Sequence, residues 1–214
     1  MRCTGVVLAG GRATRFGGAA KGLARVGGRP IVARAAEALR GSADDLLIVA
    51  NDVALDDAVP GARLVRDVVP DAGALGGLHA ALAHAGSAVL VVAWDMPFVP
   101  ESLLRALRAE GEATGADAVV PEGLGRHGLE PLCAWYAPAC LPAIAARLDA
   151  GERQAISFLS DVRVGRFALA RVRAHGDPAM VFLNVNTPAD LEAAEAHERA
   201  GAPAADAGDR GPQA

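Results

Sequence analysis

Short apolar runs alternate with longer Ala- and Leu-rich stretches over the first half of the chain. Three of the runs are almost continuously apolar: "TGVVLAG" (4–10), "DLLIVAN" (45–51) and the centre of "SAVLVVAWDMP" (87–97). A strand covered on both faces has such a run, whereas a strand with one exposed face alternates apolar and polar residues. Buried strands that alternate with helices are typical of an α/β fold, in which helices cover both faces of a mostly parallel sheet.

The same patterns give a full set of expected elements, which become less regular toward the carboxyl end. The first helix has Pro30 in its first turn and Gly41 as its terminator. Thr187, Pro188 and Asp190 form the capping pattern of the last helix. Strands are expected at 4–10, 45–51, 62–67, 87–97, 116–122, 130–136, near 163–172 and near 180–184, and helices at 29–41, 73–86, 100–112, 138–151, 152–161 and 187–200. Together they predict a Rossmann-like three-layer α/β/α sandwich with a ligand crevice at the carboxyl ends of its strands.

Length and charge limit the kinds of domain and partner. The 214 residues suit one domain, expected at 1–200, and the Gly-, Ala- and Pro-rich residues 201–214 are expected to be a disordered tail. The net charge of −4 argues against nucleic acid or a membrane as partner. Residues 1–36, in contrast, contain seven Arg or Lys and no acid, which indicates a small anionic ligand. The absence of a CxxC pair, a signal-peptide pattern and a long apolar run favours a cytoplasmic protein.

A glycine-rich basic segment, "LAGGRATRFGGAAKGL" (8–23), follows the first strand directly. Its spacing matches neither the P-loop nor the dinucleotide-binding fingerprint. Glycines nevertheless let backbone N–H groups approach phosphate oxygens closely, and a loop at the carboxyl end of a strand opens into the crevice. We therefore expect a phosphate cradle in which Arg15 and Lys21 neutralise charge. The alternative is a flexible basic loop without a ligand.

Asp95 lies at the carboxyl end of the most apolar strand, where an ionised carboxylate is costly unless something pairs with it. Mg²⁺ is a suitable partner, because it takes one or two protein carboxylates together with phosphate oxygens and water. In a doubly wound sheet the first and fourth strands are neighbours, which would bring Asp95 and the glycine segment into one crevice. A capped turn at Asp95 is the alternative interpretation.

Five stretches carry a resemblance to a known family. The segment "LAGGRATRFGGAAKGLARVGGRPIV" resembles the signature of the sugar-nucleotide-type nucleotidyltransferases, with Ala13 where serine is frequent. The stretch "VRDVVPDAGALGGLHAAL" has Ala74 where that group has proline. This stretch and three others make the chain most similar, within that group, to the molybdenum cofactor guanylyltransferases. The three others are "VVAWDMPFVP", "AGERQAISFL" and "VFLNVNTPADL".

The resemblance implies a nucleotidyltransferase that uses Mg²⁺ to move GMP from GTP to a molybdenum–molybdopterin cofactor, with release of pyrophosphate. Arg15, Lys21 and Asp95 would then be catalytic, and Asp95 would hold the metal ion. Asn51 and Asp67 would contact the base or ribose, the 73–77 glycines the guanine ring, and Asn184 and Asn186 the acceptor or the metal–phosphate group. The full set of expected binding residues is Leu8, Ala9, Gly10, Gly11, Lys21, Asn51, Asp67, Gly73, Gly77, Asp95, Asn184 and Asn186.

Other interpretations stay open at this point. A cytidylyltransferase acting on the same cofactor would keep the chemistry and change the base. A non-catalytic nucleotide-binding module would bind the ligand without turnover. Asn and Asp at strand ends are also common as ordinary turn residues. The partners implied by the resemblance are GTP and the molybdopterin-type cofactor, with cofactor-insertion and acceptor enzymes as further partners.

Overall fold

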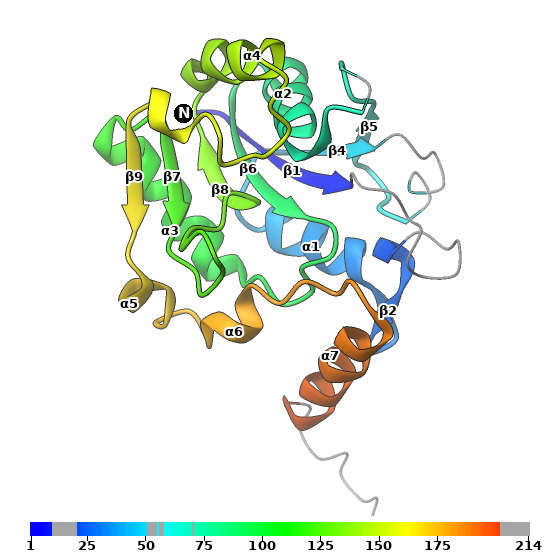
Figure 1. Ribbon diagram of the computed structural model, residues 1–214. Coiled ribbons are helices and arrows are strands. Elements are labelled where there is room, and N and C mark those ends of the chain that lie inside the picture. The colour runs from blue at the N-terminus through cyan, green and yellow to red at the C-terminus, as the bar shows by residue number, and fades with distance from the viewer. Residues whose placement is uncertain (10–20, 51–54, 56–57, 70, 202–214) are drawn as a thin grey trace, which may run out of the picture.

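A seven-stranded sheet forms the centre of the molecule (Figure 1). The computed structural model describes residues 1–9, 21–50, 55, 58–69 and 71–201. The strands lie in the order β5-β4-β1-β6-β8-β7-β9, and every neighbouring pair is parallel except the two that β8 makes with β6 and β7. The bounds are β1 Cys3–Ala9, β4 Asp45–Ala50, β5 Arg63–Val65, β6 Ala88–Ala93, β7 Ala118–Pro121, β8 Cys133–Tyr136 and β9 Val164–Phe167. The mostly parallel sheet and the pairing of β1 with β6 confirm the predictions.

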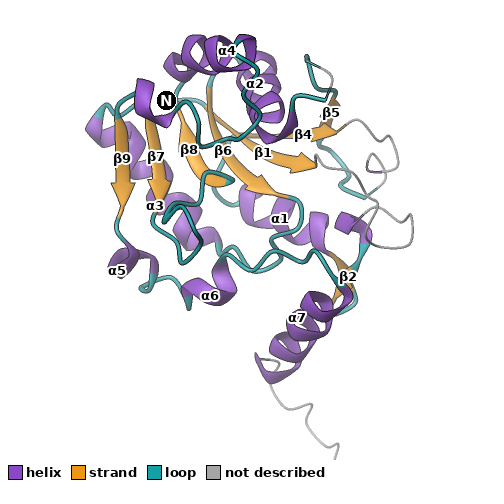
Figure 2. Cartoon of the chain, in the orientation of Figure 1, coloured by secondary structure: helices purple, strands orange, loops and turns teal. Residues whose placement is uncertain are grey.

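Helices cover both faces of this sheet, which confirms the three-layer arrangement (Figure 2). α1 (Ile31–Arg40) and α3 (Glu101–Thr114) contribute leucines and alanines to the core on one face. α2 (Gly73–Ala85) and α4 (Leu141–Asp149) contribute to a second core on the other face, where they also contact each other. The strands between them are buried on both sides, as their continuous apolar runs require.

A small third core joins the carboxyl-terminal helix to the body of the molecule. α7 (Pro188–Gly201) packs beside β2 (Arg25–Val26), which pairs with β3 (Arg29–Pro30). The guanidinium of Arg34 in α1 donates to both carboxylate oxygens of Glu198, at 2.9 and 2.7 Å. Figure 1 shows α7 extending away from the sheet, so this junction carries its attachment. The buried apolar members of this core are Val26, Ile31, Val185 and Ala194.

The capping prediction for α7 is confirmed. The Thr187 side chain accepts a hydrogen bond from Asp190 N, and the Asp190 carboxylate accepts from Thr187 N and Asn186 N. α1 ends before Gly41 as expected. No helix among the described residues is long and apolar enough to cross a lipid bilayer.

Several expected elements are wrong or shorter than predicted. Residues 152–161 form turns and a short 3-10 helix at Leu159–Asp161 instead of an α-helix, because their backbone bonds close i→i+3 turns. The strand expected near 180–184 is replaced by α6 (Pro178–Val181), which Asp177 caps through Ala179 N.

Near 163–172 only the first half is a strand, and α5 (Leu169–Val172) follows it. β6 ends at Ala93, because Trp94 and Asp95 enter a turn that Met96 N closes on Ala93 O. Of the disordered tail expected at 201–214, Gly201 is the last residue of α7, and residues 202–214 lie outside the described residues.

Candidate functional site

The carboxyl ends of β1 and β6 meet at one edge of the sheet. Leu8 and Ala9 end β1 and are almost fully buried, whereas Asp95 follows β6 in a turn and is half-buried. Trp94 N donates a hydrogen bond to Leu8 O at 3.1 Å, which joins the two strand ends. Three of the predicted site residues therefore lie around one backbone hydrogen bond.

The end of the glycine-rich segment packs against this junction. Lys21–Leu23 form a short 3-10 helix, and Gly22 lies so close to Trp94 that a β-carbon at Gly22 would be 2.5 Å from Trp94 Cε3. The residue after Lys21 thus contacts the residue before Asp95. This contact places the Lys21 backbone beside the Asp95 turn, as the shared-crevice prediction requires.

The Asn184–Asn186 segment is held at the same turn. Val185 N donates to Asp95 O at 2.9 Å, so the two asparagines flank a residue that is bonded directly to Asp95. The Asn184 side-chain amide donates to Phe182 O at 3.0 Å. The structure therefore brings Asp95, Asn184 and Asn186 together, although 184–186 is not part of a strand.

The first turns of α2 form the neighbouring wall. A β-carbon at Gly77 would contact Leu8 Cδ2 at 3.5 Å and Asp67 Oδ1 at 3.8 Å, so Gly77 lies between the end of β1 and the loop after β5. Gly73 has φ 63° and lies against the backbone oxygen of Arg153. Its missing side chain allows both the positive φ and the close approach.

Some predicted residues cannot be placed. Gly10, Gly11, Arg15 and Asn51 lie outside the described residues, and for Lys21 only the backbone is described. β4 ends at Ala50, directly before Asn51.

The donor set at this edge fits a substrate-shared metal ion better than a closed metal centre. Within the described ranges, no group of three or more His, Cys, Asp or Glu side chains could hold a metal ion. Asp95 offers one carboxylate on a half-buried turn. Mg²⁺ needs only one or two protein carboxylates when phosphate oxygens and water complete its shell.

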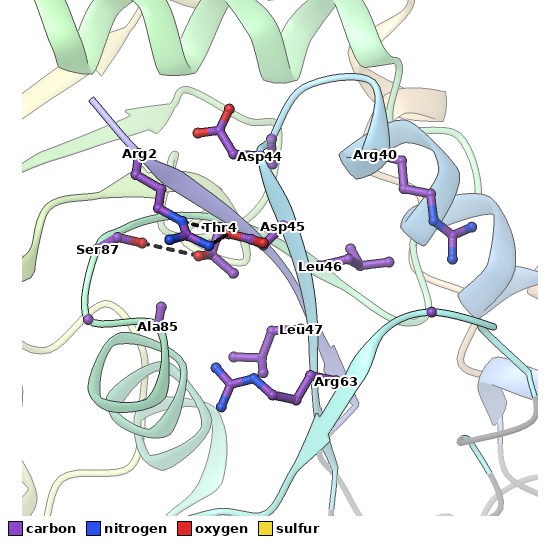
Figure 3. A pocket seen from close by; sticks show the side chains of 13 residues that line it. Arg2, Thr4, Arg40, Asp44, Asp45, Leu46, Leu47, Arg63, Ala85 and Ser87 are labelled. Carbon is purple, nitrogen blue, oxygen red and sulfur yellow. Dashed lines mark hydrogen bonds and ion pairs between the residues drawn. The ribbon is translucent and has the colours of Figure 1, made fainter.

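A hollow of about 730 Å³ lies at the opposite edge of the sheet, at the amino ends of β1 and β4 (Figure 3). Its arginines are engaged in the protein's own structure: Arg2 pairs with Asp45 at 2.6 Å, and Arg63 donates to His84 O at 2.7 Å. The carboxyl end of α2 also reaches this hollow, and its carbonyl groups favour cations. These contacts make it a structural junction, and the chemistry-bearing residues lie elsewhere.

Sequence reasoning missed two features of the predicted edge. The packing of Gly22 on Trp94 depends on a tertiary contact, and the only signal for it in the sequence was a glycine after the expected phosphate-binding lysine. Glu130 also lies at this edge, where it precedes β8; the sequence pattern places it inside the strand expected at 130–136 and gives it no role.

Comparisons with known proteins agree with this geometry. The family model described as the MobA-like NTP transferase domain matches residues 5–164. A molybdenum cofactor guanylyltransferase of Desulfosudis oleivorans is 36% identical over 199 residues, which cover 92% of this chain and 96% of that protein.

A probable molybdenum cofactor guanylyltransferase of Pelotomaculum thermopropionicum is 39% identical over 194 residues, 89% of this chain and 91% of that protein. Among solved structures, the molybdopterin-guanine dinucleotide biosynthesis protein A of Archaeoglobus fulgidus superposes with a TM-score of 0.77 at 28% identity, covering 91% of this chain and 97% of that one.

Proposed function

The chain belongs to the MobA-like NTP transferase family, and from that membership we propose that it transfers GMP from GTP to the phosphate of a molybdopterin-type cofactor. The products are the guanine dinucleotide form of the cofactor and pyrophosphate. The observation that carries this proposal is the convergence of Leu8, Asp67, Gly77, Asp95 and the 184–186 segment on one sheet edge. Relatives named molybdenum cofactor guanylyltransferase that match about nine-tenths of the chain supply the substrate class.

In this reaction the protein must position the substrates and neutralise charge, and proton transfer is less important. The attacking phosphate oxygen of the acceptor is already anionic, so a strong general base is unnecessary. Catalysis then depends on alignment with the α-phosphorus and on neutralising charge in the transition state. Arg15 and Lys21 serve the β- and γ-phosphates in this proposal, and the backbone of Gly10 and Gly11 cradles them.

Asp95 would hold Mg²⁺ at the boundary between the two substrates. When bound, such an ion would supply charge stabilisation to the transferred phosphate. Asp67 and the glycines of α2 are assigned to the base and ribose side, because Gly77 lies between Leu8 and Asp67. Asn51 follows the neighbouring strand β4 and is assigned to the same side. Asn184 and Asn186 flank Val185, whose N–H donates to Asp95 O, and are assigned to orienting the acceptor phosphate.

Nucleotide preference is tested by thermal unfolding of the protein with GTP, CTP, ATP or UTP, each with Mg²⁺. A ligand that binds only the folded state adds RT ln(1 + [L]/Kd), about 2.7 kcal/mol at 100 times Kd. We expect the largest shift with GTP. A larger shift with CTP would assign the chain to cytidylyl transfer, and equal shifts would remove the guanine assignment.

Transfer itself is measured as pyrophosphate release from GTP in the presence of purified molybdopterin. The guanine dinucleotide product is identified by mass spectrometry. We expect release only when both substrates and Mg²⁺ are present. Binding of GTP without turnover on any molybdopterin preparation would favour a non-catalytic binding module.

A further inference from the structure

Glu130 lies on the connection between β7 and β8, on the other side of β6 from β1, β4 and β5. Ala93 N donates to Leu132 O at 2.9 Å, which continues the β6–β8 pairing to the sheet edge. Asp95 follows Ala93 by two residues, and Glu130 precedes Leu132 by two. The two acids therefore lie within two residues of the same hydrogen bond, on adjacent segments.

The backbone of Glu130 is fixed on both sides. Its N–H donates to Pro121 O at 2.9 Å, and its carbonyl oxygen accepts from Cys133 N at 3.1 Å. The side chain passes over Gly123, which has no β-carbon in its way. A half-buried carboxylate is thus held at a defined place above the ends of β7 and β8.

This carboxylate has no hydrogen-bond donor or cation partner among the described residues. Burial alone raises the pKa of Glu130 above its ordinary value. Glu122, on the same connection, is different: its carboxylate accepts from Leu169 N at 3.1 Å and pairs with Arg166 at 3.4 Å. A desolvated acid without a partner in the protein costs stability unless a ligand supplies the donors.

Gly123 and Gly125, which flank Leu124, both lie against Oε1 of Glu130. Leu124, on the same connection, is 60% exposed, which is unusual for a large apolar side chain in the described part of the chain. An exposed apolar side chain on the same connection as a carboxylate without a partner among the described residues can cover a ring while the carboxylate binds its polar edge.

We propose that Glu130 binds the pterin of the acceptor by accepting hydrogen bonds from its ring N–H and its exocyclic 2-amino group. This inference rests on the function proposed above and assigns the part of the site that selects the acceptor. Guanine presents the same two donors, but the nucleotide residues Leu8, Asp67 and Gly77 lie on the β1 side of β6. Asp95, at the end of β6, then separates a nucleotide half from an acceptor half.

The first test compares Glu130→Gln with Glu122→Gln in the full-length protein. Glutamine keeps the shape of the side chain and replaces one acceptor oxygen with a donor. We expect Glu130→Gln to raise the KM for molybdopterin roughly ten- to hundredfold, the factor for losing a charged hydrogen bond, with the KM for GTP unchanged within about twofold. Its unfolding midpoint should not fall, because a desolvated charge is removed. Glu122→Gln should lower the midpoint and leave the KM for molybdopterin unchanged.

The second test measures binding directly, by fluorescence of 6-hydroxymethylpterin and of 6-hydroxymethyllumazine, which has oxygen in place of the 2-amino group. The wild-type protein should prefer the pterin, and Glu130→Gln should lose the preference.

An unchanged KM for molybdopterin together with an unchanged pterin preference would overturn the inference, and so would a Glu130→Gln protein that fails to fold. If the wild-type protein binds the pterin selectively but transfers no GMP, the proposed function fails, and the binding comparison still decides the role of Glu130.

Discussion

At the scale of single residues, Asp95 contributes two different groups to the site, and substitution can separate them. Its backbone oxygen accepts the hydrogen bond from Val185 N that holds the 184–186 segment. Its side-chain carboxylate is the group proposed to hold Mg²⁺. A change confined to the side chain keeps the first role and removes the second.

Asp95→Asn is therefore expected to fold normally and to lose catalysis. The amide keeps the shape of the side chain but lacks the anionic oxygen that Mg²⁺ requires. Guanylyl transfer should fall by several orders of magnitude, because metal ions contribute several kcal/mol of charge stabilisation to such transition states. Pyrophosphate release gives the rate and circular dichroism confirms folding. Near-normal turnover in a folded protein would remove Asp95 from the metal site.

The basic residues of the glycine segment give a second prediction. Lys21→Ala and Arg15→Ala should each weaken GTP binding and slow transfer, because each removes a charge from the proposed triphosphate cradle. Arg15→Lys should restore only part of the loss if the guanidinium grips phosphate in bidentate fashion. Arg2→Ala is the control, since Arg2 carries the same charge at the opposite edge of the sheet. GTP titration followed by fluorescence checks the affinities, and wild-type values for Lys21→Ala would contradict the cradle.

At the scale of elements, the contact between the Lys21–Leu23 turn and Trp94 fixes the glycine segment to the sheet edge. Gly22→Ala would place a methyl group 2.5 Å from Trp94 Cε3. Overpacking of this kind costs about 1–3 kcal/mol or displaces the weaker element, here the short turn. We expect a higher KM for GTP with a lower unfolding midpoint.

Gly201→Ala is the matched control, because a β-carbon there meets nothing within 4 Å. If Gly22→Ala has wild-type kinetics and stability, the contact with Trp94 does not position the segment.

The junction of α7 gives a further prediction at this scale. Arg34 donates to Glu198 with two nitrogens and also to Val26 O and Pro97 O. Its side chain is 16% exposed, so solvent screens these bonds only partly. Arg34→Met should lower the free energy of unfolding by about 1–3 kcal/mol, measured in urea. Arg199 forms a 3.6 Å ion pair with Glu195 that is largely exposed. Arg199→Met should therefore change the free energy of unfolding by less than about 0.5 kcal/mol. Equal effects of the two changes would contradict the role of Arg34.

An element could be predicted from the sequence where a local pattern determines it, and could not where tertiary contacts determine it. β1, β4 and β6 are buried on both faces, so their continuous apolar runs identified them, and the order of buried strands implied that β1 and β6 are neighbours. The failures at 152–161 and 180–184 are short segments whose conformation depends on tertiary contacts. Arg153 O, for example, accepts from Leu75 N in α2, which no local pattern reveals.

The positions of residues that lie directly at the ends of buried strands were predictable. Leu8 and Asp95 meet as expected, because the parallel strands β1 and β6 present their carboxyl ends at one edge. The 184–186 segment follows no strand and reaches Asp95 through the hydrogen bond from Val185 N, which the expected strand near 180–184 did not predict. The role proposed for Glu130 was not predictable, since it depends on the lack of a donor among the described residues, which only the folded structure shows.

At the scale of the whole molecule, acid stability follows from carboxylates with lowered pKa values. Arg163, Arg147 and Arg34 lower the pKa of Asp117, Asp161 and Glu198 respectively. The backbone N–H of Cys3, ahead of Arg108, lowers the pKa of Asp44. A carboxyl group with a lowered folded-state pKa stabilises the protein above its unfolded pKa and loses that contribution as pH falls through the folded value.

These carboxylates should therefore make the urea midpoint fall below about pH 4, where unfolded carboxyl groups begin to bind protons. Asp117→Asn should lower the midpoint at neutral pH and make its fall on acidification less steep. Both are measured by urea titration across that pH range. A steeper fall in the variant would contradict the assignment of Asp117.

The reversed direction of β8 has a consequence for how such a protein can diversify. Because β8 runs antiparallel to β6 and β7, residues 122–132 return along the sheet edge as a hairpin-like connection. Insertions or replacements in such a surface connection leave the strands beneath it intact. The residues beside β1, β4 and β5 belong to separate connections. If Glu130 binds the acceptor as proposed, new acceptor specificities could be grafted onto 122–132 without changing the connections beside β1, β4 and β5.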